Sequence, residues 1–223
     1  MHVRDLAQFL AELSENNNRA WFAMNKPRYD LLRLEFLELV TELIKGISAF
    51  DPAVANCNPK KALFRFHRDM RFAREGGPYK TTFSASITSS GLKRPSQGGG
   101  PAYYFHIDAN GSLLVAGGEY MPPADRLRAI RFQLEKNEVG LIAALKDRNL
   151  KKTFGSLQEE GKLLRPPKGF SPDLPQIELI KLKSFIVWTE NSIGGLSGAA
   201  LKKQLLSNFR HAFPLIAWLR SIK

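Results

Sequence analysis

The order of apolar and polar residues predicts helices in the N-terminal part of this chain. Apolar side chains fall at helical intervals over 3–14, and the asparagines at 16–18 are predicted to end this amphipathic helix. Pro27 suits a first helical turn, and the apolar spacing beyond it predicts a second helix to about Gly46. Residues 48–63 contain two prolines that follow Asp or Asn, so they are predicted to form a loop.

An alternation of period two replaces the helical spacing at residues 64–72 and predicts a strand. Phenylalanines alternate there with Arg, His and Asp, although Arg68 falls on the apolar side. The same alternation predicts three further strands, at 83–88, 103–108 and 112–120. Asn110-Gly111 is a strong hairpin signal between the last two, which predicts an antiparallel pair.

Helical spacing returns after these strands. It predicts a helical region over 122–150 that Gly140 interrupts, followed by a basic, proline-rich and irregular stretch over 151–176. Residues 177–188 fit either a helical turn or a strand. The last apolar-spaced segment predicts a helix with a kink or break at Pro214.

Helices at both ends with hairpin strands between them are typical of an α+β fold. We therefore predict a single domain over residues 1–223, with an antiparallel sheet of about four to six strands. The N- and C-terminal helices are predicted to pack on one face of this sheet, the face that carries the phenylalanines.

The composition, with 43% hydrophobic and 24% charged residues, is that of an ordinary globular protein. No apolar run approaches the roughly 18–20 residues of a membrane span, and the N-terminal apolar pattern contains acids, so we expect neither a span nor a secretory signal. Cys57 is the single cysteine, which excludes an internal disulfide and a Cys-based zinc site. A cytoplasmic location is the expectation that follows.

The net charge of +12 is concentrated in two stretches of the chain. Residues 64–100 carry seven basic and two acidic side chains, and residues 151–223 carry twelve and five, whereas the remaining stretches are balanced. Such clustering favours a polyanionic partner, while lysines scattered on solvated faces are the simpler alternative.

The alternating stretch at residues 64–72, called the arginine-rich segment below, and the strands near it supply the candidate ligand-binding residues. Guanidinium groups offer paired donors that match phosphate or carboxylate oxygens, and tyrosines can stack on bases. The predicted ligand-binding residues are Arg65, Arg68, Arg71, Tyr79, Lys80, Tyr104 and His106. The alternative for the basic residues is an ion-pair network with Asp69, Glu75 or Glu119.

Two His-x-Asp pairs lie on the polar side of predicted strands. If these strands are neighbours in register, two imidazoles and two carboxylates converge, and they could bind a divalent metal or act as acid and base. The weak metal candidates are His67, Asp69, His106 and Asp108, and the catalytic candidates are His106 and Asp69. Their spacing matches no metal signature, and no common nucleotide-binding or hydrolase motif is present, so plain surface polarity is the alternative.

Several motifs of this chain match a known family. They are Asn17-Asn18-Arg19, Trp21-Phe22, Asn25-Lys26, Phe64-Arg65, Arg68-Asp69-x-Arg71-Phe72, Pro78-Tyr79-Lys80-Thr81, Tyr103-Tyr104, His106-Ile107, Gly117-Gly118 with Tyr120, Phe154-Gly155, and Pro167-Lys168-Gly169-Phe170 to Lys183. Together they resemble the uncharacterised bacterial and fungal proteins called domain of unknown function 2461. Two positions depart from that pattern, because Glu75-Gly76-Gly77 replaces an Asp-Lys and Leu174 replaces a histidine. The resemblance implies a single α+β domain and implies no activity.

Our leading hypothesis from the sequence is a binding module for an anionic ligand, either a phosphate-bearing metabolite or nucleic acid. The ligand would lie on a basic, polar sheet face that carries Arg65, His67, Arg71, Tyr104 and His106. One alternative is an enzyme of hydrolase or transferase type, in which arginines hold the anion while His106 and Asp69 move protons. Another is a protein-interaction domain. Cofactors and oligomeric state are left open.

Overall fold

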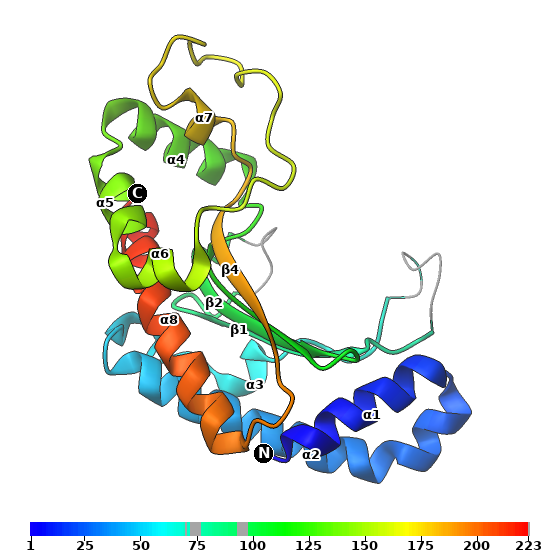
Figure 1. Ribbon diagram of the computed structural model, residues 1–223. Coiled ribbons are helices and arrows are strands. Elements are labelled where there is room, and N and C mark those ends of the chain that lie inside the picture. The colour runs from blue at the N-terminus through cyan, green and yellow to red at the C-terminus, as the bar shows by residue number, and fades with distance from the viewer. Residues whose placement is uncertain (70, 72–76, 93–97, 223) are drawn as a thin grey trace.

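A four-stranded antiparallel sheet forms the centre of the molecule. The computed structural model describes residues 1–69, 71, 77–92 and 98–222 (Figure 1). The strands lie in the order β1-β2-β3-β4. Their bounds are Thr82–Thr88 for β1, Ala102–Asp108 for β2, Ser112–Glu119 for β3 and Phe185–Ser192 for β4. The prediction of an α+β fold with an antiparallel sheet is confirmed.

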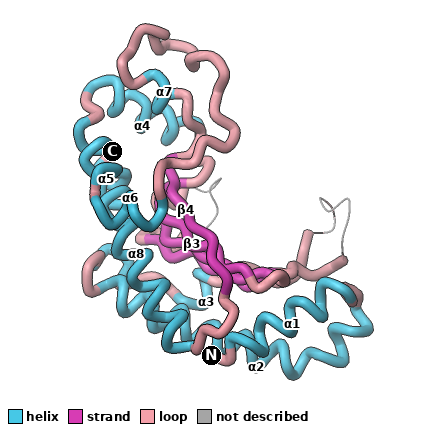
Figure 2. The backbone as a smooth tube through the Cα atoms, viewed as in Figure 1, coloured by secondary structure: helices cyan, strands magenta, loops and turns pink. Residues whose placement is uncertain are grey.

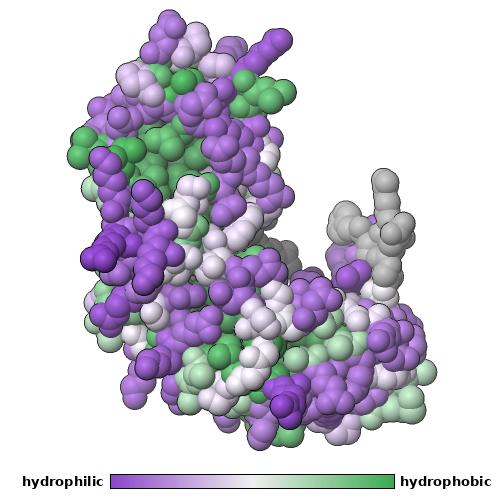
Figure 3. Space-filling model, viewed as in Figure 1, coloured by the Kyte–Doolittle hydropathy of each residue, from purple (hydrophilic) through white to green (hydrophobic). Residues whose placement is uncertain are grey.

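The helices form two groups around this sheet (Figures 1 and 2). Three long helices cover one sheet face, namely α1 (Val3–Glu15), α2 (Arg19–Ser48) and α8 (Gly198–Ser221). Short helices η1 (Pro52–Val54) and α3 (Pro59–Ala62) connect α2 to β1. The second group contains α4 (Ala124–Lys136), α5 (Val139–Lys146), α6 (Arg148–Phe154) and α7 (Ile177–Ile180). In the space-filling view the two groups meet at an angle, and hydrophilic side chains cover much of the surface (Figure 3).

The core lies between the sheet and the three long helices, as the alternation predicts. In β2, Tyr103 and Phe105 face these helices and are fully buried. The ring of Phe36 in α2 lies 5.3 Å from that of Phe105, and the ring of Phe209 in α8 lies 5.4 Å from that of Tyr103. The N- and C-terminal helices therefore pack on the same, aromatic face of the sheet.

A buried polar network crosses this core. Asp51 is only 2% exposed and accepts hydrogen bonds from the hydroxyl of Tyr103 at 2.8 Å and from Arg220 Nη1 at 2.7 Å and Nη2 at 3.0 Å. Burial and the adjacent Asp51 carboxylate raise the pKa of Tyr103. Asp51 thus joins the start of η1 to β2 and to the end of α8.

Glycine allows α8 to approach the sheet closely. A Cβ atom on Gly117 of β3 would lie 2.4 Å from the Cβ of Ala212 in α8, closer than two carbon atoms can pack. Gly117 therefore marks a close approach of the β3 backbone to α8, whereas a Cβ on Gly118 would meet the backbone of Phe185 and Ile186 in β4.

The helices differ from the sequence predictions at their boundaries. The second helix begins at Arg19 and not at Pro27, because the side chain of Asn18 accepts the backbone N–H of Trp21 and caps the earlier start. Pro27 lies on the exposed side of α2, where water can satisfy the carbonyl that loses its partner. Pro214 likewise lies within an unbroken α8.

Three other parts of the chain also differ from the predicted boundaries. Gly140 lies inside α5, and the predicted 122–150 region is interrupted instead after Lys136 and at Asp147. The predicted loop over 48–63 contains the two short helices η1 and α3. Residues 177–188 contain both predicted alternatives, since α7 is followed by β4.

The arginine-rich segment is not a regular strand, so that prediction is wrong for its described residues. Isolated bridges join Leu63 to Ala85 and His67 to Tyr79, and the second bridge is flanked by backbone hydrogen bonds from Arg68 to Pro78 and from Lys80 to Phe66. Residues 70 and 72 lie outside the described part. The side chain of Asn17 bonds to the other edge of Tyr79. It donates to the Tyr79 carbonyl at 2.9 Å and accepts the Tyr79 N–H at 3.1 Å.

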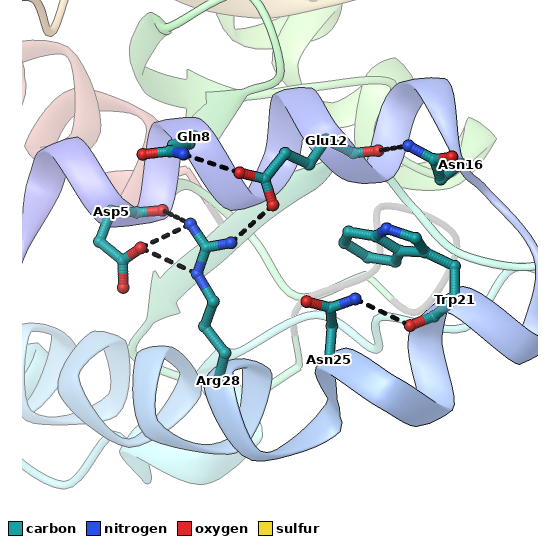
Figure 4. Close-up of polar contacts among 7 residues, drawn as sticks. All are labelled: Asp5, Gln8, Glu12, Asn16, Trp21, Asn25 and Arg28. Carbon is teal, nitrogen blue, oxygen red and sulfur yellow. Dashed lines mark hydrogen bonds and ion pairs between the residues drawn. The ribbon is translucent and has the colours of Figure 1, made fainter.

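The helices α1 and α2 form an antiparallel pair held by ion pairs (Figure 4). Arg28 of α2 donates through Nε to Asp5 at 2.8 Å and through Nη1 to Glu12 at 2.6 Å, both on α1. This pair presents Asn17 at its turn to the backbone of Tyr79.

Both outer edges of the sheet have partners or polar residues. Beside β1, the backbone N–H of Phe64 donates to the Ser84 carbonyl at 3.0 Å. Beside β4, the backbone N–H of Gln158 donates to the Ile186 carbonyl at 3.0 Å. The last residues of β4, Glu190 to Ser192, are exposed and polar.

Candidate functional site

The sheet face opposite the three long helices contains a pocket of about 450 Å³. Strand register places the residues of this face in rows. One row holds Ser86, Tyr104, Ala116 and Trp188, and the row beside it holds Thr88, Ala102, Gly118 and Ile186. All eight line the pocket.

Small residues hollow this face between larger aromatic ones. Ala116 separates Tyr104 from Trp188 by two strand spacings, which is about 10 Å. Ala102 and Gly118 continue the low floor into the next row. Large side chains on a flat sheet would fill this space, so the depression follows from where alanine and glycine occur.

Segments from outside the sheet form the walls. They include Phe64, Leu92, Tyr120, Pro122 and Glu160. The ring of Phe64 meets that of Tyr104 edge to face, with centroids 5.9 Å apart. The walls and floor are therefore mainly apolar and aromatic, with a few polar groups.

Tyr104 and His106 supply polar groups on the floor. The Tyr104 hydroxyl oxygen lies 3.1 Å from His106 Nδ1, and Ser84 also hydrogen-bonds to that hydroxyl. Burial raises the pKa of Tyr104 and lowers that of His106; nearby Asp108 and Glu190 oppose the second shift. At neutral pH the imidazole is therefore uncharged.

Thr88 and Glu119 stand at the other end of the pocket. The Thr88 hydroxyl is buried and has no hydrogen-bond partner among the described residues. Glu119 is 3% exposed and pairs with Arg126 at 3.1 Å. Arg126 also donates to the Leu219 carbonyl at 2.6 Å, so it neutralises both the carboxylate and the end of α8.

Of the predicted ligand-binding residues, the structure brings Tyr104 and His106 to this pocket. The basic residues Arg65, Arg68, Arg71 and Lys80 do not line it. Arg71 is exposed and pairs with Asp69 at 2.7 Å, one of the partners that the ion-pair alternative names. The lining within the described chain contains no lysine or arginine, and ligand binding by the basic residues stays a prediction.

Tyr79 lies in the core. It is 5% exposed and its ring stacks on Phe22 with centroids 4.1 Å apart. Its ring therefore packs against the core and does not line the pocket, and ligand binding by Tyr79 stays a prediction. Lys80 has a closer relation to the pocket, because its Nζ lies 5.5 Å from the ring centre of the wall residue Phe64.

The two His-x-Asp pairs do not converge by strand pairing. His67 bridges to Tyr79, whereas His106 lies opposite Ser84 of β1. Their segments are not neighbours, since β1 lies between the arginine-rich segment and β2. Across the described ranges, no group of three or more His, Cys, Asp or Glu side chains could hold a metal ion.

Sequence reasoning missed Trp188 and the small floor residues. The signal for Trp188 was present, because Ile186, Trp188 and Glu190 alternate with core residues in β4. The same stretch also fitted a helical turn, so its face was undefined. Ala116 and Ala102 carried no signal, since their role depends on the register of neighbouring strands.

Comparisons with known proteins give a family and no activity. The model of a family described as conserved hypothetical protein (DUF2461) matches residues 5–218. No curated protein and no solved structure gives a significant match. Within the residues that the structure describes, none of the helices has the length and apolar character needed to cross a bilayer.

Proposed function

The chain belongs to the DUF2461 family of conserved hypothetical proteins, and from its pocket we propose that it binds a small aromatic molecule. The observation that supports this proposal is the hollow on the open sheet face, bordered by Phe64, Tyr104, Tyr120 and Trp188. Its volume of about 450 Å³ is within the range of roughly 300–1,000 Å³ that is usual for ligand pockets.

The chemistry of the lining favours a flat, largely apolar ligand. Aromatic side chains gain both burial and ring-to-ring contacts from such a molecule. The polar groups are few and include Tyr104 and His106 at one end and Thr88 and Glu119 at the other, and a small number of placed polar groups fixes the orientation of a bound molecule.

Anion binding remains a second candidate, now in a narrower form. Lys80 Nζ lies 5.5 Å from the ring centre of the wall residue Phe64. An acidic group on an aromatic ligand beside Phe64 would therefore lie near the Lys80 ammonium group. Binding of a free phosphate or nucleic acid by Arg65, Arg68 and Arg71 stays a prediction. An enzymatic role for His106, without Asp69 beside it, and a role in protein interaction also stay hypotheses.

Replacement of Ala102 by leucine tests the proposal. Ala102 is half-buried on the pocket floor, so three added carbons occupy ligand space without disturbing the core face. The matched control is Ala143→Leu, at an exposed position of α5. Binding of three naphthyl probes (2-acetylnaphthalene, 2-naphthoate and 2-naphthylmethylammonium) is measured by titration calorimetry.

We expect the wild type to bind at least one probe, and Ala102→Leu to weaken that binding by about tenfold or more, since a tenfold change corresponds to only ~1.4 kcal/mol. Ala143→Leu should bind like the wild type. A preference for 2-naphthoate that disappears in Lys80→Met would establish the second candidate. The proposal fails if no probe binds the wild type at millimolar concentration. It also fails if Ala102→Leu binds the probes as tightly as the control Ala143→Leu.

A further inference from the structure

Two polar side chains on the pocket floor, Tyr104 and His106, share a hydrogen bond, and Ser84 lies beside them. Ser84 and His106 are partners across the β1–β2 pair, and Tyr104 lies two residues before His106 on the same face. Ser84 bonds to the Tyr104 hydroxyl, whose oxygen lies 3.1 Å from His106 Nδ1.

The direction of the hydrogen bond between Tyr104 and His106 follows from the chemistry of its two groups. A phenol O–H is a stronger donor than an imidazole N–H, and an imidazole nitrogen is a stronger acceptor than a phenol oxygen, so the Tyr104 hydroxyl donates to Nδ1. A neutral imidazole has one N–H, and burial keeps His106 neutral. The proton therefore lies on Nε2.

Nothing in the described residues uses that proton. His106 lines the pocket, and no hydrogen bond of its Nε2 is present there. Asp108 and Glu190 are the acids whose charges act on His106, and each of them accepts a hydrogen bond from another residue. Asp108 accepts the backbone N–H of Ser112 at 2.9 Å, and Glu190 accepts the Ser112 hydroxyl at 2.6 Å.

We propose that His106 determines specificity by donating its Nε2–H to an acceptor oxygen of the ligand, a carbonyl or carboxylate attached to an aromatic ring. This proposal rests on the small-molecule function above and names its ligand class. The row of His106 is two residues from the row of Tyr104 and Trp188, about 7 Å along the strand. If the ring of the ligand lies beside Tyr104 and Trp188, an oxygen on one of its substituents can reach His106.

Tyr104 is a positioning residue in this arrangement. Its hydroxyl fixes the tautomer that presents a donor to the pocket. Without it, Nδ1 and Nε2 compete for the proton, and Nε2 presents an acceptor in part of the molecules.

A matched pair of neutral probes tests the proposal. 2-Acetylnaphthalene carries the acceptor oxygen, and 2-ethylnaphthalene has a similar shape without it. We expect the wild type to prefer the ketone by about three- to tenfold, the range for one hydrogen bond. His106→Phe should abolish the preference while still binding 2-ethylnaphthalene, and His106→Gln, which keeps an N–H donor, should restore part of it.

Tyr104→Phe should reduce the preference of the wild type without abolishing binding of 2-ethylnaphthalene. The ratio of the two dissociation constants is the readout, because a merely structural role of His106 would weaken both probes equally. If the wild type binds both probes equally and Ala102→Leu weakens both, this inference is overturned and the proposed function stands. If neither probe nor the charged naphthyl probes bind, both fall.

Discussion

Asp51 is the residue whose replacement should destabilise the fold most specifically. It is 2% exposed and is held by Tyr103 at 2.8 Å and by both terminal nitrogens of Arg220. Asp51→Ala leaves a buried phenol without an acceptor and a guanidinium without its counter-ion. Since Tyr103 belongs to β2, whose opposite face carries Tyr104, this network also supports the pocket floor.

The magnitude follows from burial. Breaking a buried pair by removing one partner costs about 3–5 kcal/mol. Water reaches Arg220, whose side chain is 26% exposed, so the lower end of that range applies. Tyr103→Phe removes one hydrogen bond to a charged group, for which about 1.5–3 kcal/mol is typical. The double variant Asp51→Ala/Tyr103→Phe should cost less than the sum, because Tyr103 has already lost its acceptor.

Urea unfolding at neutral pH measures these free energies. The control is Asp30→Ala, which breaks the surface pair with Lys26, both side chains being more than half exposed at 53% and 59%. That control should cost at most about 0.5 kcal/mol. Additive losses in the Asp51 and Tyr103 variants, or a cost of Asp51→Ala below about 1 kcal/mol, would refute the reasoning.

Two further predictions concern Asn17 and His106. Asn17→Ala should cost about 1–3 kcal/mol, because the backbone N–H and carbonyl of Tyr79 both lose their partner. Asn17→Asp keeps the acceptor but sets a second acceptor against the Tyr79 carbonyl, so it should not restore the stability. Urea unfolding that shows no loss in Asn17→Ala would contradict this prediction. The lowered pKa of His106 means that the unfolded chain binds its proton first, so the stability present above pH ~6.5 should decline as pH falls below it. His106→Gln should flatten that part of the urea-derived profile, and identical profiles for the two proteins would contradict the assignment.

The sequence could predict the sheet because its information is local. Alternation over 83–88, 103–108 and 112–120, with Asn110-Gly111, needs only neighbouring residues, and the strands and hairpin were confirmed. The same alternation over 64–72 predicted a regular strand, whereas the described residues there form isolated bridges, because alternation does not determine how many backbone partners a segment finds.

Proline positions show how tertiary contacts override local preference. Pro27 marks a helix start by propensity, yet Asn18 caps an earlier turn, and the ring of Phe22 then stacks on Tyr79. For the site, Tyr104 and His106 were predictable from one strand. Trp188 had a signal in the alternation of β4, but its place beside Ala116 and Tyr104 depends on a register that spans three strands.

The edges of the sheet have a consequence for self-association. Unpaired backbone groups on an outer strand can template a strand from another molecule and start aggregation. Beside β1 the N–H of Phe64 already bonds to Ser84, and beside β4 that of Gln158 bonds to Ile186. Where β4 runs on without such cover, it ends in the exposed, polar stretch from Glu190. Growth by strand addition is thus disfavoured at the apolar parts of both edges.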